Sequence, residues 1–152
     1  MTHPTWTPLQ RRLHWFVAAI VLMQFLLQDA MRSATDTATG GGRIGFIDFV
    51  VTTVHSWGGA LIAFLVIYRL VLRRRSPVVV GHGSLGPLAA RFVQANHLLL
   101  YALLLMMCVS GVLHYHAGLE FAARWHEVGK WLLALATALH VAGALWHYRR
   151  RV

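Results

Sequence analysis

The stretch that decides the fold is residues 126–148, HEVGKWLLALATALHVAGALWHY, which is almost wholly apolar yet contains three histidines. A helix needs about 20 apolar residues to cross the roughly 30 Å hydrocarbon core of a bilayer. This stretch meets that length, so we predict a membrane-spanning helix. Ionisable side chains are costly to place in lipid, and the histidines inside the span are therefore candidate functional residues.

Three other stretches have the same character, at residues 13–31, 49–72 and 92–113. Together the four spans predict an all-α integral membrane protein, a four-transmembrane-helix bundle, in which helices satisfy their own backbone groups inside lipid. No internal repeat or linker divides the chain, so we expect residues 1–152 to form a single membrane domain. The expected connections are residues 34–45, 73–91 and 114–125.

The composition agrees with a membrane protein and excludes a nucleic-acid binder. Of the 152 residues, 57% are hydrophobic and 12% are charged, against about 45–50% and about 25% in soluble domains. The net charge of +9 would otherwise suggest nucleic acid, but a basic patch needs a polar, solvated surface to carry it. We therefore expect membrane lipid around the chain and no nucleic-acid partner.

The distribution of charge predicts the orientation. Both termini and the second connection share one side of the membrane, and that side holds ten of the 14 cations. The other side holds four cations and all five acids, so the two sides carry +10 and −1. Cytoplasmic loops are rich in Lys and Arg, which predicts that both termini are cytoplasmic. The ten cations are Arg11, Arg12, Arg69, Arg73, Arg74, Arg75, Arg91, Arg149, Arg150 and Arg151.

The fourth span presents two histidines on one face. His126 and His140 are 14 residues apart, which returns a helix to within roughly 40° of the same direction and separates the rings by roughly 21 Å along the axis. One ligand near each membrane face suits two stacked cofactors. By depth, His55 near the outer end of the second span matches His126.

The inner ligand pair begins with His14, which follows two arginines at the inner end of the first span. His140, His147 and His97 all match its depth. A cofactor pair at His126 and His147 would be about 31 Å apart, the whole hydrocarbon core. Electron tunnelling falls steeply with distance, so we pair His14 with His140 and keep His147 as the alternative.

Two histidines per centre, without a thiolate or carboxylate at the same depth, favour two haem b groups. A catalytic zinc site takes three protein ligands and an open position, whereas bis-histidine haem iron is saturated and suited to electron transfer. The single Cys108 excludes the Cys-x-x-Cys-His attachment of a c-type haem. For His97 and His147, a quinone or proton-handling role and a packing role both remain open. The expected iron ligands are His14, His55, His126 and His140.

These residues form motifs that resemble a known family. They are Gln10-x-x-x-His14-Trp15, His55-x-x-Gly58 with Arg69-Leu70, Asn96-His97-x-x-x-Tyr101 with Ser110-Gly111, and His126-Glu127 with Leu139-His140-x-x-x-Ala144-Leu145-x-His147. Over nearly the whole chain they resemble the bacterial cytochrome b561 family, of which superoxide oxidase is the characterised enzyme. The resemblance implies a dihaem bundle in the bacterial inner membrane, with His14 and His140 on the cytoplasmic-side haem and His55 and His126 on the periplasmic-side haem.

The resemblance also implies an activity. An electron donor on the periplasmic side, either a small molecule such as superoxide or a protein, would reduce the outer haem. The electrons would pass through the two haems to ubiquinone, bound near His97 and His147. This would be a superoxide:ubiquinone oxidoreductase. The alternative is a membrane-anchor or electron-transfer cytochrome b subunit that serves a partner redox protein. A haem or metal carrier without redox function is a third interpretation. One departure is that the connection 114–125 is shorter than in the superoxide oxidases.

Overall fold

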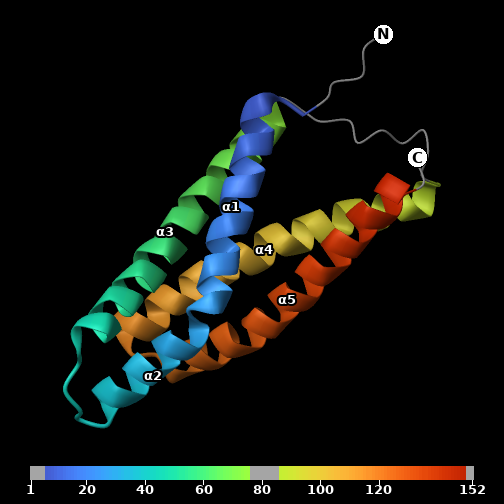
Figure 1. Cartoon of the computed structure of the whole chain (residues 1–152). Coiled ribbons are helices and arrows are strands. Elements are labelled where there is room, and N and C mark those ends of the chain that lie inside the picture. The colour runs from blue at the N-terminus through green and yellow to red at the C-terminus, as the bar shows by residue number, and fades with distance from the viewer. Residues whose placement is uncertain (1–5, 76–85, 150–152) are drawn as a thin grey trace. The chain divides into compact units, whose positions relative to one another are not determined.

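The computed structural model describes residues 6–75 and 86–149, and in these ranges the chain is helical without strands (Figure 1). The predicted all-α class is confirmed. The helices are α1 (Pro8–Leu26), α2 (Gln28–Thr39), α3 (Phe46–Arg75), α4 (Pro87–Ala117) and α5 (Glu120–Arg149).

Three helices are long and apolar enough to cross a membrane, namely α3, α4 and the part of α5 from Glu120 to His147. A fourth span is obtained when α1 and α2 are counted as one bent segment. The structure therefore agrees with a multi-pass protein of three to four spans. The orientation of the termini stays a prediction.

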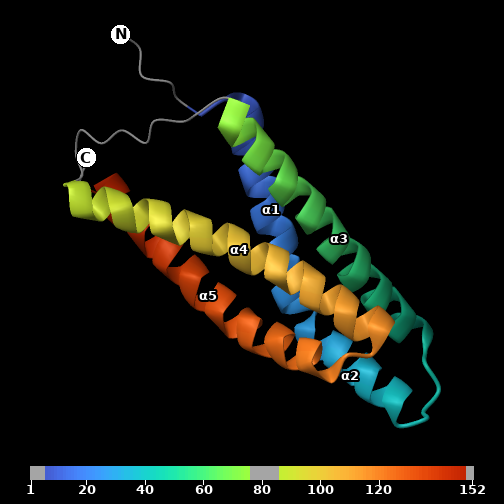
Figure 2. The ribbon, with the colours of Figure 1, turned by 180° about the vertical axis from the view of Figure 1, so that it is seen from behind.

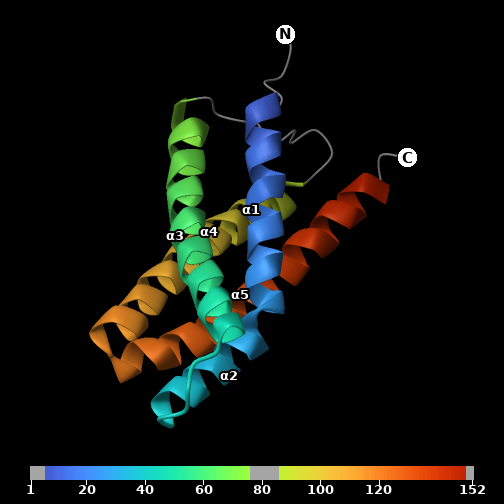
Figure 3. The same ribbon diagram turned by 60° about the vertical axis from the view of Figure 1, so that its left-hand side comes forward.

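The predicted first span, residues 13–31, contains a bend that the sequence pattern did not indicate. Helix α1 ends at Leu26, α2 starts at Gln28, and the two helices are bent by 48° at this break. Figure 3 shows the change of direction. Neither proline nor glycine causes the bend. The apolar run ends at Leu27, and α2 is amphipathic, since it buries Ala34 while Asp29 is exposed. A polar helix is costly to continue through lipid, so the change in composition accounts for the change in direction.

The start of α1 is defined by a reciprocal cap. The Thr7 hydroxyl oxygen accepts from the Gln10 backbone N–H (3.2 Å), and the Gln10 side-chain oxygen accepts from the Thr7 backbone N–H (3.0 Å). Pro8 occupies the first turn, where its missing N–H has no cost. Helix α4 begins similarly, with Pro87 after Gly86. These signals place both helix starts about five residues before the predicted apolar spans.

The predicted third connection, 114–125, is wrong because most of it is helical. Only Gly118 and Leu119 separate α4 from α5. Gly118 has a φ of 64°, in the left-handed region that glycine enters without strain, and its N–H donates to the His114 carbonyl at 3.0 Å. The α4–α5 pair is thus a tight helical hairpin.

The other two predicted connections also contain helix. Residues 34–39 of the connection 34–45 belong to α2, where threonine hydroxyls bond to carbonyls four residues earlier. Within the connection 73–91, α3 continues to Arg75 and α4 starts at Pro87. Between them, Gly86 caps α4, and residues 76–85 lie outside the described part of the chain.

The chain separates into two compact units. One is Thr7–Val71, here called the α1–α3 unit, and the other combines Met1–Trp6 with Leu72–Val152 and is called the α4–α5 unit. In the α4–α5 unit the two long helices pack along each other (Figure 2) and bury Leu103, Leu133 and Ala136. The prediction of a single domain is not tested by this division and stays a prediction.

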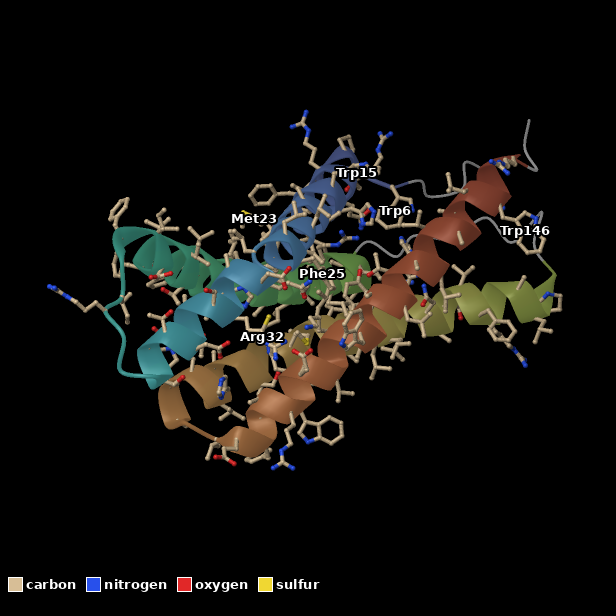
Figure 4. All side chains as sticks on the ribbon, turned by 60° about the horizontal axis from the view of Figure 1, so that its bottom comes forward. Trp6, Trp15, Met23, Phe25, Arg32 and Trp146 are labelled. Atoms are coloured by element: carbon tan, nitrogen blue, oxygen red, sulfur yellow. The ribbon has the colours of Figure 1, made fainter. Side chains whose placement is uncertain are left out.

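The large apolar side chains of these helices are mostly on the outside. Trp15 on α1 is 71% exposed and Trp146 on α5 is 61% exposed, and Figure 4 shows both on their helices. Trp57 and Trp131 are exposed to a similar degree. Exposed apolar surface of this extent is unfavourable in water and is expected of helices that face lipid.

Candidate functional site

The predicted ligands are divided between the two units. His14 lies on α1 and His55 on α3, whereas His126 and His140 lie on α5. Each predicted iron-binding pair therefore joins one residue from each unit, and both pairings stay predictions. What the structure does provide is the environment of each histidine within its own unit. All four side chains are half-buried.

His126 is held against α4 by two oxygen atoms. Its Nδ1 lies 3.0 Å from the Met107 carbonyl oxygen and 3.2 Å from the Ser110 hydroxyl oxygen. The Ser110 hydroxyl also donates to the Met107 carbonyl at 3.2 Å, and Ser110 is buried. We call Met107, Ser110 and His126 the His126 cluster.

This geometry determines which nitrogen of His126 carries the proton. A carbonyl oxygen only accepts hydrogen bonds, so an Nδ1 at 3.0 Å from it must be the N–H donor. The lone pair of the neutral ring is then on Nε2. Metal-binding histidines characteristically donate their second ring N–H to a carbonyl or carboxylate, which orients the ring and strengthens it as a ligand.

Glycine allows the ring to approach α4 this closely. A Cβ added at Gly111 would lie 3.2 Å from His126 Cε1, closer than ordinary carbon–carbon contact. One turn further along α5, the Met106 and Met107 side chains of α4 lie against Gly129. A Cβ added at Gly129 would overlap both of them. Small residues thus bring α4 and α5 together on both sides of the His126 cluster.

His97 and His140 form a second contact between α4 and α5. Their ring centroids are 4.9 Å apart and the rings are nearly perpendicular, at 89°. His97 Nδ1 lies 2.6 Å from the Val93 carbonyl oxygen, so by the same reasoning Nδ1 carries the proton and the lone pair is on Nε2. The structure therefore brings together a predicted ligand and a predicted quinone-site residue. His147, near the end of α5, is half-buried.

In the α1–α3 unit, Gln24 contacts the backbone of His55. Its Nε2 donates to the His55 carbonyl oxygen at 3.3 Å. Gly58, one turn after His55, makes room for this side chain, since a Cβ there would collide with the Gln24 amide. His14 stacks edge to face with its neighbour Trp15 at 5.4 Å.

The charges next to His126 are partly neutralised. Lys130 forms an ion pair with Glu127 at 2.7 Å, and its ammonium group also lies 5.1 Å from the Trp131 ring centroid. Arg124 is exposed. Lys130 is paired with Glu127, and of these two cations Arg124 is the more exposed one.

Sequence reasoning did not assign roles to Ser110, Met107, Val93 or Gln24. Ser110 and Gly111 could be noticed as small residues in an apolar span, but their function depends on facing His126. That relationship requires the register of the α4–α5 hairpin. The carbonyls of Met107 and Val93 carry no side-chain signal at all.

Comparison with known families decides the identity of this arrangement. The family model described as prokaryotic cytochrome b561 matches residues 5–152. The chain belongs to the prokaryotic cytochrome b561 family. It is accordingly a multi-pass membrane cytochrome, and membership implies haem b and haem-mediated electron transfer across the membrane. Searches of curated proteins and of solved structures gave no significant match.

The residues of this chain fit the haem b that the cytochrome b561 family implies. His126 keeps its Nδ1–H on the Met107 carbonyl, which leaves the lone pair on Nε2 as the one that could coordinate iron. Beside the ring, the neighbouring helix contributes the Ser110 hydroxyl and Gly111. A neutral imidazole whose second nitrogen bonds to a backbone carbonyl is a typical, oriented ligand for a metal such as haem iron.

Proposed function

We propose that this cytochrome b561 family member is a dihaem electron carrier of the bacterial inner membrane with both termini in the cytoplasm. His55 and His126 would hold the periplasmic-side haem, and His14 and His140 the cytoplasmic-side haem. The observation that carries the proposal is that α5 presents His126 and His140 on one face, each in contact with α4. Bound haems would supply one-electron transfer between the two faces.

Ubiquinone is the proposed acceptor, at a site near His97 and His147. His97 supports this assignment because its ring lies against His140 and its Nε2 carries a lone pair able to accept a proton. Reduction of one ubiquinone takes two electrons and two protons and gives one ubiquinol. A base beside the inner ligand places proton exchange close to the point of electron delivery.

Superoxide is the proposed donor on the periplasmic side. Two superoxide ions would each lose one electron and leave as O₂, and these two electrons match the need of one ubiquinone. The test is stopped-flow mixing of purified protein with superoxide, with and without a soluble ubiquinone analogue. We expect haem reduction by superoxide and reoxidation by the quinone, with O₂ and quinol formed in a 2:1 ratio. Failure of superoxide to reduce the haem excludes this donor.

A second candidate function is an electron-transfer subunit for a partner redox protein. The two-residue turn between α4 and α5 favours this alternative. The superoxide oxidases that the chain resembles have a longer connection there, which could help to bring superoxide to the outer haem. The pairing of Lys130 with Glu127 also removes one cation that could attract superoxide. Under this alternative, superoxide leaves the haem oxidised and a reduced soluble cytochrome or flavoprotein reduces it.

A further inference from the structure

We propose that Ser110 is a positioning residue for His126, and that with the Met107 carbonyl it sets the ring orientation and the electron-donating strength of this ligand. The proposal rests on the proposed function, because it takes His126 as an iron ligand. It assigns to a hydroxyl on α4 a role in tuning the outer haem that neither residue type nor family membership supplies.

The first step of the argument is the closed arrangement of hydrogen bonds. The Ser110 hydroxyl has one proton, and it donates that proton to the Met107 carbonyl at 3.2 Å. Its oxygen lone pairs are therefore available to the His126 Nδ1–H, which lies 3.2 Å away. The Nδ1–H is thus shared between two oxygens from the same turn of α4, and rotation of the ring in either direction weakens one of these bonds.

The second step is that the ring has little space in which to turn. Gly111 follows Ser110 on α4, and its backbone is close enough that a single added methyl group would reach 3.2 Å from His126 Cε1. Ser110 itself is only 5% exposed, so water does not replace its hydroxyl freely. The orientation of the imidazole plane is therefore set by the contacts that α4 makes with it.

The third step is the electronic consequence. Acceptors on the Nδ1–H increase the negative charge on the ring, which strengthens Nε2 as a donor and favours the oxidised metal. Removing one of two acceptors has the opposite effect. We therefore expect loss of the Ser110 hydroxyl to raise the midpoint potential of the outer haem and to leave the inner haem unchanged.

The experiment uses the haem-loaded, purified full chain. Ser110→Ala is compared with Ser33→Ala, a matched deletion of an exposed hydroxyl on α2. Ser110→Thr is the rescue variant, since a threonine hydroxyl also bonds to the carbonyl of the preceding turn. The readouts are haem content, potentiometric titration and the low-spin EPR signal, which reports the relative orientation of the two axial imidazole planes. His126→Ala identifies which signal belongs to the outer haem.

We expect Ser110→Ala to retain two haems while the potential of the outer haem rises and its EPR signal shifts. Ser110→Thr and Ser33→Ala should match the native chain. The inference is overturned if Ser110→Ala leaves both readouts unchanged, if the potential falls, or if Ser110→Thr shifts them as much as alanine does. A separate result would contradict the proposed function, namely a His126→Ala variant that still contains both haems.

Discussion

Replacing His140 and His147 with alanine, one at a time, separates the two candidate inner ligands on α5. Helix α5 runs unbroken from Glu120 to Arg149, so the rise per residue converts sequence separation into distance. His140 is 14 residues from His126, which corresponds to about 21 Å, and His147 is 21 residues away, which corresponds to about 31 Å. Under the proposed ligation each iron would be bound directly by its histidine ring, so the distance between the two irons should be close to the same values.

The assay is haem quantification followed by pulsed dipolar EPR between the two oxidised irons. We expect His140→Ala to contain one haem in place of two and to lose the dipolar signal. His147→Ala should keep both haems and a separation of about 21 Å, as 14 residues of helix require. A separation near 31 Å in the native chain, or two haems in His140→Ala, would refute the choice of His140.

Three further changes test the local structure. Gly111→Ala should lower the content of the outer haem, because its Cβ would press against His126 at 3.2 Å; Gly143→Ala, where a Cβ meets nothing within 4 Å, is the control for the haem-to-protein ratio. Gly118→Ala should cost about 1–2 kcal/mol, seen as a lower thermal unfolding midpoint, since its φ of 64° is strained for alanine; an equal midpoint would contradict the left-handed cap. Thr7→Ala should cost about 1 kcal/mol and increase hydrogen exchange in the first turn of α1, and unchanged exchange would show that the cap is dispensable.

The long apolar runs made the helical class predictable. The ends of the helices and the connections between them were predicted less well. The run 126–148 lies within α5, and the runs 49–72 and 92–113 lie within α3 and α4. Helix ends depend on capping and not on hydropathy, which is why α4 continues to Ala117 and α5 already begins at Glu120. A glycine followed directly by an apolar residue is the signal that could have located this turn.

The bend after Leu26 was missed because apolar length alone was used to define the first span. The amphipathic spacing of Met31, Ala34 and Thr35 was visible in the sequence and indicates a separate helix with one buried face. In the candidate site, too, only part of the arrangement could be predicted from the sequence. Histidines stand out in apolar spans, but the partners of His126 are a backbone carbonyl and a serine, which become meaningful only when the hairpin brings them together.

The placement of His126 and His140 on the last helix has a consequence for biosynthesis. Under the proposed ligation each haem takes one ligand from α5, so a nascent chain that has reached only Ala117 can complete neither site. Cofactor capture must then follow the synthesis of α5 and its pairing with α4. Because a two-residue turn joins these helices, their contacts are local in sequence and can form quickly once α5 has been made. Stable retention of haem would then report that the chain has been translated and inserted as far as α5.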